Sequence, residues 1–221
     1  MSRGPATTTF EAMGIRGAAV DPDVALMLAL QKGNDAAFAE LVARHQSRIV
    51  ALICRFVGNE TEAEDLAQEV FLRVYRTRHR YQPKARFSTW LYRIAANISL
   101  NALRNRRRRL AISLPLTFDS DETQEGQTSE HVRDPRETPP GARLEGDELR
   151  ERVREAIDKL PETQRMAVVL NKYEDLSYDE IASVMECSTM AVKSLLARAR
   201  TNLRDSLEYY LKTGRLRQAL T

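Results

Sequence analysis

Metal-binding and nucleophilic residues are scarce in this chain. Its 221 residues include only two cysteines and three histidines. Cys54 and Cys187 lie far apart, and neither has a partner at the spacing of metal ligands. Both fall among apolar residues with a helical period, so we expect buried free thiols. The sequence therefore predicts no metal site, no cofactor, no catalytic constellation and no small-molecule substrate.

Long apolar runs and phosphate-binding glycine loops are also absent. No apolar run approaches the roughly 20 residues that span a membrane, and the N-terminus lacks the apolar core of a signal peptide. We therefore expect a cytoplasmic protein. Without a glycine-rich loop, metal-ligand spacing or suitably paired carboxylates, the chain is not expected to be an enzyme acting on DNA or RNA.

Charge is arranged in blocks of opposite sign. The formal net charge is only +3, yet residues 58–69 contain five acids and no base. Residues 72–109 contain twelve bases and no acid. Such alternation predicts one surface for a basic protein partner and a second surface for nucleic acid.

Aromatic residues lie within the basic stretch. Basic charge attracts phosphate, and flat rings can stack on bases that have left a duplex. The combination suits DNA that is being opened as well as bound. The alternative is a solvated cationic helix with its rings in a core, and some of the rings are expected to be core. The five aromatic residues are Tyr75, Tyr81, Phe87, Trp90 and Tyr92.

Helical periodicity predicts a first domain over residues 23–112, after a flexible extension of residues 1–22. Asn34 and Asn59 are placed to cap two of its helices, and Ser88 is placed to cap the long helix that follows. A loop that contains Pro83 precedes this long helix.

The composition of residues 113–145 predicts a flexible acidic linker. The segment 111–145, with eight acids, three bases and several prolines, has no apolar period. A second helical domain is predicted over residues 146–212, with a short tail at 213–221. The expected fold is therefore all-α, with two small helical domains joined by the linker.

The second domain contains a predicted helix-turn-helix. Ser177 and Glu180 form a capping box before a short helix, and a tight turn then leads to Ser188, which can cap the last helix. A generic helical hairpin is the alternative. Small Ala182, the tight turn and the one-signed charge of the last helix favour DNA binding in the major groove.

Four motifs, in order, resemble a known family. They are Ala-Glu-Asp-Leu-Ala-Gln-Glu-Val-Phe at 63–71, Phe-Ser-Thr-Trp-Leu-Tyr-Arg-Ile-Ala-Ala-Asn at 87–97, Leu-Pro-Glu-Thr-Gln-Arg at 160–165 and Leu-Ser-Tyr-Asp-Glu-Ile-Ala at 176–182. Together they resemble a group 4 (extracytoplasmic-function, ECF) sigma factor of bacterial RNA polymerase. The resemblance covers roughly residues 23–112 and 146–208.

The resemblance implies that the first domain binds core polymerase and the promoter −10 element. Asp65, Gln68 and Glu69 match the helix that docks on the clamp helices of the largest polymerase subunit. The 81–86 loop and Asn97 match positions that hold and read a flipped base. For Trp90, core packing is favoured over base stacking. The candidate −10 residues are Tyr81, Lys84, Arg86, Trp90, Arg93, Asn97, Asn101 and Arg104.

The resemblance also implies that the second domain binds the −35 element. Met190 and Leu195 depart from the common pattern there, and Leu195 replaces a frequent basic contact, so the −35 specificity is not carried over. The candidate −35 residues are Ser188, Thr189, Lys193, Ser194, Arg198 and Arg200.

The partners that this resemblance implies are core RNA polymerase and promoter DNA. It also implies that the free protein is a monomer. The family's habit adds an anti-sigma factor, which could hold the protein at the membrane. The acidic linker would pass through the polymerase cleft. The competing interpretation is a free-standing helix-turn-helix regulator that binds an operator as a dimer, but it leaves the acidic block and the aromatic, basic stretch without a role.

Overall fold

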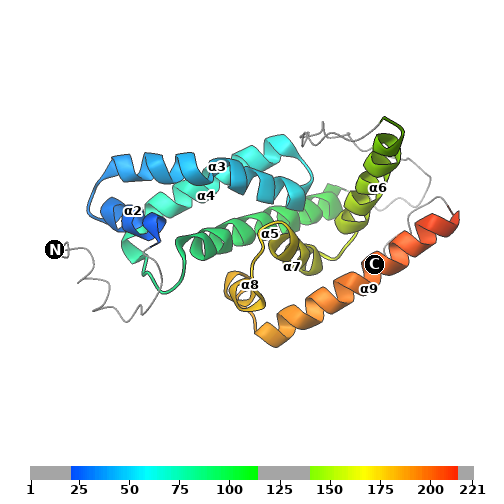
Figure 1. Cartoon of the computed structure of the whole chain (residues 1–221). Coiled ribbons are helices and arrows are strands. Elements are labelled where there is room, and N and C mark those ends of the chain that lie inside the picture. Colours follow the sequence, from blue (N-terminus) through cyan, green and yellow to red (C-terminus); the bar gives the residue numbers. More distant parts are fainter. Residues whose placement is uncertain (1–20, 114–139, 214–221) are drawn as a thin grey trace, which may run out of the picture.

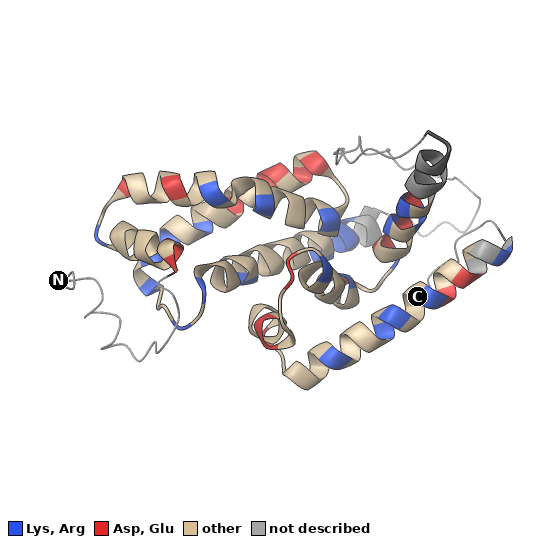
Figure 2. Ribbon diagram, in the orientation of Figure 1, with Lys and Arg blue, Asp and Glu red and all other residues tan. Residues whose placement is uncertain are grey.

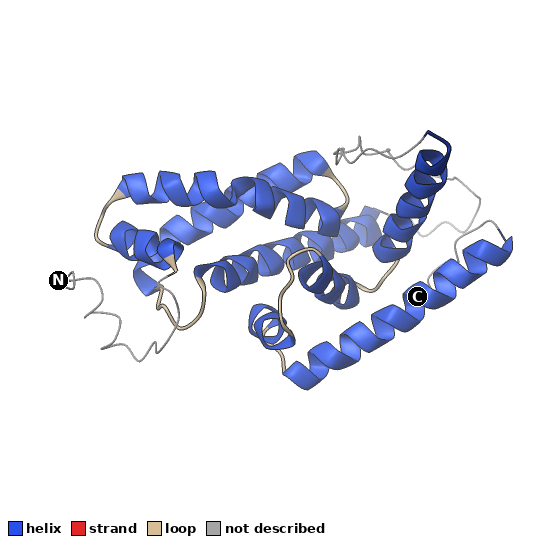
Figure 3. Ribbon diagram, viewed as in Figure 1, coloured by secondary structure: helices blue, strands red, loops and turns tan. Residues whose placement is uncertain are grey.

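The computed structural model describes residues 21–113 and 140–213. Within these ranges every regular element is a helix, which confirms the all-α prediction (Figures 1 and 3). The elements are α2 (Pro22–Gln31), α3 (Asp35–Val57), α4 (Glu60–Thr77), the short 3-10 helix η1 (Arg78–Arg80), α5 (Phe87–Ser113), α6 (Pro140–Asp158), α7 (Glu162–Lys172), α8 (Tyr178–Met185) and α9 (Thr189–Thr213).

Helices α2 to α5 form the first domain around one apolar core. The side chains of Phe56, Val74 and Leu91, from three different helices, are fully buried there. Both asparagine caps are confirmed, because Asn34 Oδ1 accepts from the first-turn amide of Ala36 and Asn59 Oδ1 accepts from that of Glu62. These local caps fix where α3 and α4 begin.

Helix α5 begins differently from the prediction. It starts at Phe87, so Ser88 lies inside its first turn and does not cap it. The carboxylate of Asp21 takes that place, since its Oδ2 accepts the Phe87 amide at 3.0 Å while its Oδ1 accepts the Asp23 amide at 3.1 Å. One side chain thus joins the starts of α2 and α5. Helix α2 accordingly begins at Pro22, inside the expected N-terminal extension.

Helices α6 to α9 form the second domain. The Ser177–Glu180 capping box at the start of α8 is confirmed. Helix α6 begins at Pro140, so the last six residues of the expected linker are helical. Ser113, the first residue of that linker, ends α5, and residues 114–139 lie outside the described residues, as do almost all of the expected N-terminal extension and C-terminal tail.

The two domains pack against each other. Helix α5 lies against α8, and α3 lies against α7 (Figure 1). One continuous cluster of buried side chains runs through both domains, from Met27 in α2 to Ala199 in α9. The sequence predicts two domains but not this closed arrangement.

Candidate nucleic-acid and partner interfaces

Helix α4 presents an acidic face to solvent. Asp65, Gln68 and Glu69 are all exposed, three and four residues apart, while the opposite side of the helix is buried in the core. Leu72 continues the same face and is 52% exposed, so an apolar side chain lies beside the acids. The structure therefore brings together all three residues that were predicted to bind core polymerase.

A polar stripe runs along α5. Asn97, Asn101 and Arg104 are exposed and follow one another at helical spacing. Arg93 lies one turn before Asn97 but is half-buried, because its guanidinium pairs with Glu186 of the second domain at 3.6 Å. Four of the predicted −10 residues thus share one stripe about 16 Å long.

The loop between η1 and α5 is anchored by an aromatic cluster. Trp90 is half-buried, with its ring centroid 4.9 Å from that of Tyr81 and 5.9 Å from that of Phe87, so it packs as the sequence analysis favoured. Lys84 and Arg86 are exposed on the loop. These two cations are exposed basic side chains of the loop.

Tyr81, one of the candidate −10 residues, lies in the core and not on the surface of the loop. It is only 4% exposed and is part of the core. Burial, with smaller contributions from Asp21 and Asp23, raises the pKa of its phenol well above its usual range. The ring therefore packs beneath the loop, against Phe87 and Trp90.

The helix-turn-helix is held by short polar contacts. Glu186 adopts a left-handed conformation (φ 53°) in the turn, and Ser188 Oγ accepts the Ala191 amide at 3.1 Å, which confirms Ser188 as the cap of α9. Thr189 Oγ1 donates to Asp179 Oδ1 at 2.7 Å, which ties the start of α9 to α8. Ser188 and Thr189 thus have structural partners inside the motif.

The outer face of α9 is basic and open. Lys193, Ser194 and Arg198 are exposed, and so is Arg200, whose guanidinium donates to the Tyr178 hydroxyl at 3.1 Å. Blue bands along this helix in Figure 2 mark the row of cations. Its Leu195, by contrast, is half-buried against the core.

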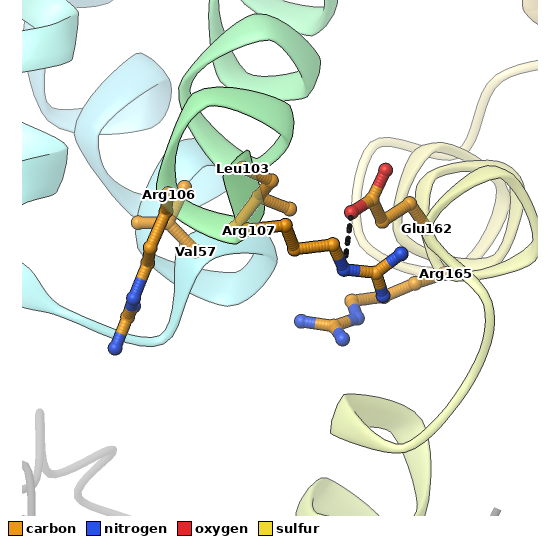
Figure 4. A pocket seen from close by; sticks show the side chains of 6 residues that line it. All are labelled: Val57, Leu103, Arg106, Arg107, Glu162 and Arg165. Carbon is orange, nitrogen blue, oxygen red and sulfur yellow. Dashed lines mark ion pairs between the residues drawn. The ribbon is translucent and has the colours of Figure 1, made fainter. Parts of the chain in front are cut away.

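An arginine-lined cavity of about 230 Å³ lies where the two domains meet (Figure 4). Arg107 comes from α5, whereas Glu162 and Arg165 come from α7, and Arg107 Nε lies 3.2 Å from Glu162 Oε1. Arg165 donates to the backbone carbonyls of Phe56 and Asp158, so it fastens the start of α7 to the ends of α3 and α6. Burial lowers the pKa of Arg165.

Several residues that shape these surfaces are not evident in the sequence. Gln31, Arg48 and Glu174 each bind partners more than 40 residues away. The sequence gives no local signal for them, since each reads as an ordinary polar surface residue. In the described part of the chain no three metal-ligating side chains gather, and no helix is both long and apolar enough to cross a bilayer.

Comparison with known proteins covers most of the chain. The family model for sigma-70 region 2 matches residues 41–109, and that for sigma-70 region 4 matches residues 150–203. The RNA polymerase sigma-H factor of Pseudomonas aeruginosa is 38% identical over 192 residues, which are 87% of this chain and 97% of that protein. The ECF RNA polymerase sigma-E factor of Escherichia coli is 33% identical over 186 residues, which are 84% and 94% of the two chains.

Solved structures agree on the arrangement of the helices. CnrH, in complex with the cytosolic domain of CnrY, aligns with a TM-score of 0.59 and 25% identity over 86% of this chain and 99% of that one. The sigma factor RpoE of Bartonella quintana, in complex with the anti-sigma factor NepR, aligns with a TM-score of 0.56 over 80% and 98% of the two chains. Because its sequence identity is only 20%, the similarity to this second structure shows a shared fold and nothing more.

Proposed function

Because this chain belongs to the sigma-70 family of RNA polymerase sigma factors, in its ECF group, we propose a division of labour among the surfaces described above. The acidic face of α4 docks on core polymerase, the stripe on α5 holds melted −10 DNA, and α9 reads the −35 element. The observation that best supports this proposal is that a single chain exposes three such surfaces. They are an acidic helix, a helix with polar and basic residues, and a basic helix-turn-helix. A free-standing regulator would need only the last of these.

The core-binding assignment rests on charge and shape. Asp65 and Glu69 supply negative charge on an exposed helix, which suits a basic helical partner. Leu72, 52% exposed one turn beyond Glu69 on the same face, offers an apolar contact beside the acids. The partner that fits is therefore a helical surface with basic side chains next to an apolar one.

The −10 assignment rests on the Asn97 amide of α5 and on the cations of the loop before it. A base that leaves the duplex exposes its Watson–Crick edge, and the exposed amide of Asn97 offers both a donor and an acceptor to it. Lys84 and Arg86 on the loop can bind the adjoining phosphates. Binding the flipped base offsets the free energy of local melting.

Helix α9 carries the −35 assignment. The first turns of a recognition helix read base edges in the major groove, and Lys193 and Ser194 lie there on the exposed side. Arg198 and Arg200 lie one to two turns further along, where a helix leaves the groove and meets phosphate. Leu195, which replaces a frequent basic contact of the family, is half-buried here and packs against the core.

The family's members are initiation factors that bind DNA. For this chain we propose that it performs no chemistry of its own and that polymerase forms every phosphodiester bond. We also propose a cytoplasmic site of action and a protein partner that holds the factor silent, at the membrane in some conditions. The related CnrH was solved in complex with the cytosolic domain of CnrY, which supports a partner of this kind.

The test is transcription in vitro from a library of genomic promoter fragments, with core polymerase, in the presence and absence of the protein. Discrete start sites that need the protein are the expected result. Asn97→Ala should weaken initiation on duplex promoters while core affinity is unchanged, and Asn105→Ala, two turns further along α5, is the matched control. Loss of core affinity in the Asn97 variant would contradict the assigned role.

A further inference from the structure

The first turn of α9 presents an apolar side chain to solvent. Among the described residues, four large apolar side chains are exposed, and Met190, at 73%, is the most exposed of them. An isolated apolar side chain on a protein surface is ordinary. Met190 differs from the other three in its place, because it is the second residue of the last helix of the helix-turn-helix.

The helix backbone fixes the direction of this side chain. Successive residues of an α-helix are rotated by about 100°, so Met190 lies roughly 200° around the helix from Val192. Val192 is fully buried and belongs to the core side of α9, together with Leu196 and Ala199. The Met190 side chain therefore leaves the helix on the side opposite the core.

Polar contacts hold the start of α9 in place. Ser188 Oγ accepts the Ala191 amide at 3.1 Å. Thr189 Oγ1 donates to Asp179 Oδ1, in α8, at 2.7 Å. The first turn is thus fixed relative to α8, and Met190 is held at a defined position on its outer side.

Met190 begins an exposed stripe of mixed chemistry. At helical spacing it is followed by Lys193 and Ser194, and then by Ala197 and Arg198, all of which are exposed. The stripe follows the outer side of α9, which lies at one edge of the molecule (Figure 1). In a helix-turn-helix, the first turns of this helix meet the base edges in the major groove. The residue that starts the stripe is therefore placed to contact a base.

We propose that Met190 selects a thymine in the −35 element by packing its side chain against the C5-methyl group of that base. The inference rests on the −35 assignment of α9 proposed above. A methionine side chain has no hydrogen-bond donor and only a weak acceptor. Of the groups that base edges display in the major groove, the thymine methyl is the apolar one. It is therefore the group that this side chain can recognise.

The same contact disfavours the other bases. Guanine, adenine and cytosine display hydrogen-bonding groups in the major groove. A methionine that covers such a group removes its water and offers no partner in return, which costs free energy. Met190 thus discriminates both by what it gains at thymine and by what is lost at any other base.

The spacing on α9 predicts where the thymine lies. Lys193 and Ser194 follow Met190 by three and four residues, which is about 4.5–6 Å along the helix. Stacked base pairs are about 3.4 Å apart, so this distance corresponds to about one or two of them. Lysine recognises the O6 and N7 atoms of guanine. The thymine should therefore lie within about two base pairs of a guanine that Lys193 contacts.

The test uses holoenzyme, assembled from core polymerase and the full chain, on a promoter defined by its start site. Each thymine of the −35 segment is replaced singly by deoxyuridine, which keeps every hydrogen-bonding group and lacks only the methyl. Initiation is measured in competition with the unmodified promoter.

Four proteins are compared in this assay. They are the wild type, Met190→Ala, Met190→Leu and the control Leu149→Ala. Alanine and leucine are both good helix formers, so the exposed position 190 accepts either without loss of the helix. The control also removes an exposed apolar side chain, 53% exposed on α6, but it lies outside the stripe.

One thymine should respond in the wild type. Its replacement should lower initiation about fourfold, the factor that corresponds to ~0.8 kcal/mol for one buried methyl-sized group. Met190→Leu and the control should keep this sensitivity, and Met190→Ala should lose it. Equal sensitivity of the wild type and Met190→Ala at every thymine would overturn the inference, as would a −35 segment in which no thymine responds.

A promoter with a scrambled −35 segment separates this inference from the function on which it rests. Scrambling should lower initiation by all four proteins. If it does so while the response to deoxyuridine is independent of Met190, only the present inference fails. If scrambling has no effect, the −35 assignment of α9 fails with it. An equal loss by Met190→Ala on the intact and the scrambled promoter would indicate contact with a protein partner, and would also overturn the inference.

Discussion

Replacing Gln31 by methionine should loosen the loop that carries the −10 cations. Gln31 Nε2, at the end of α2, donates to the backbone carbonyl of Arg78 at 2.7 Å and to that of Tyr81 at 2.8 Å. Methionine has a similar length and helix propensity but no donor. The substitution therefore keeps the packing and removes one hydrogen bond from each carbonyl, of which that of Arg78 still accepts from the Tyr81 amide at 3.2 Å.

The magnitude follows from these two hydrogen bonds. Each contributes about 0.5–1.5 kcal/mol net, so together they stabilise the fold by about 2 kcal/mol. For a chain of 150–250 residues, a change of this size lowers Tm by roughly 4–8 °C. The functional effect should concentrate on the loop, because Tyr81 is its first residue and Lys84 and Arg86 follow.

The assay combines thermal unfolding with transcription from two templates. The Gln31 variant should melt earlier than the wild type, and it should lose more activity on a duplex promoter than on one melted in advance. Gln82→Met, an exposed change in the same loop, is the control and should melt as the wild type does. An unchanged Tm, or equal losses on the two templates, would refute the role of Gln31 in positioning the loop.

Three further outcomes follow from the described contacts. Ser177→Ala removes the capping box of α8 and should lower the free energy of unfolding by about 1 kcal/mol, which chemical denaturation would detect. Reversing the charge of Asp65 and Glu69 should weaken affinity for core polymerase, measured by fluorescence titration, without changing Tm; unchanged affinity would contradict the docking assignment. Burial raises the pKa of the Cys54 and Cys187 thiols, so at pH 8 both contain less thiolate than a free cysteine and should alkylate more slowly, with a rate that rises as pH increases.

Local interactions explain which parts of the fold could be predicted. Asn34, Asn59 and Ser177 cap helices through amides two or three residues away, so a short stretch of sequence contains all the information. The start of α5 could not be read in this way. Its cap is Asp21, 66 residues earlier in the chain, and only the packing of α2 beside α5 brings the carboxylate to the Phe87 amide.

In the candidate surfaces, too, local features could be predicted from the sequence and long-range contacts could not. Helical spacing places Asp65 and Glu69 on one face, and that face is exposed as predicted. Spacing cannot reveal what covers a face, and so Arg93 shares the stripe of Asn97 yet is paired with Glu186. Tyr81 is a second residue whose surroundings the sequence does not reveal. An aromatic ring in a basic loop suggests base stacking, but neighbouring side chains bury this ring.

The chemistry of the closed contact explains why a carboxylate lies at its centre. Glu174 reads as part of a polar loop in the sequence, and it is buried only because Arg48 and Tyr92 converge on it from 126 and 82 residues away. Desolvation offsets much of the attraction in a buried ion pair, so such a contact gives a defined geometry with little net stability. An apolar side chain there would hold the domains more firmly, but it would leave an exposed apolar patch on opening. Charged partners can be hydrated by water when they separate, and this makes the contact reversible.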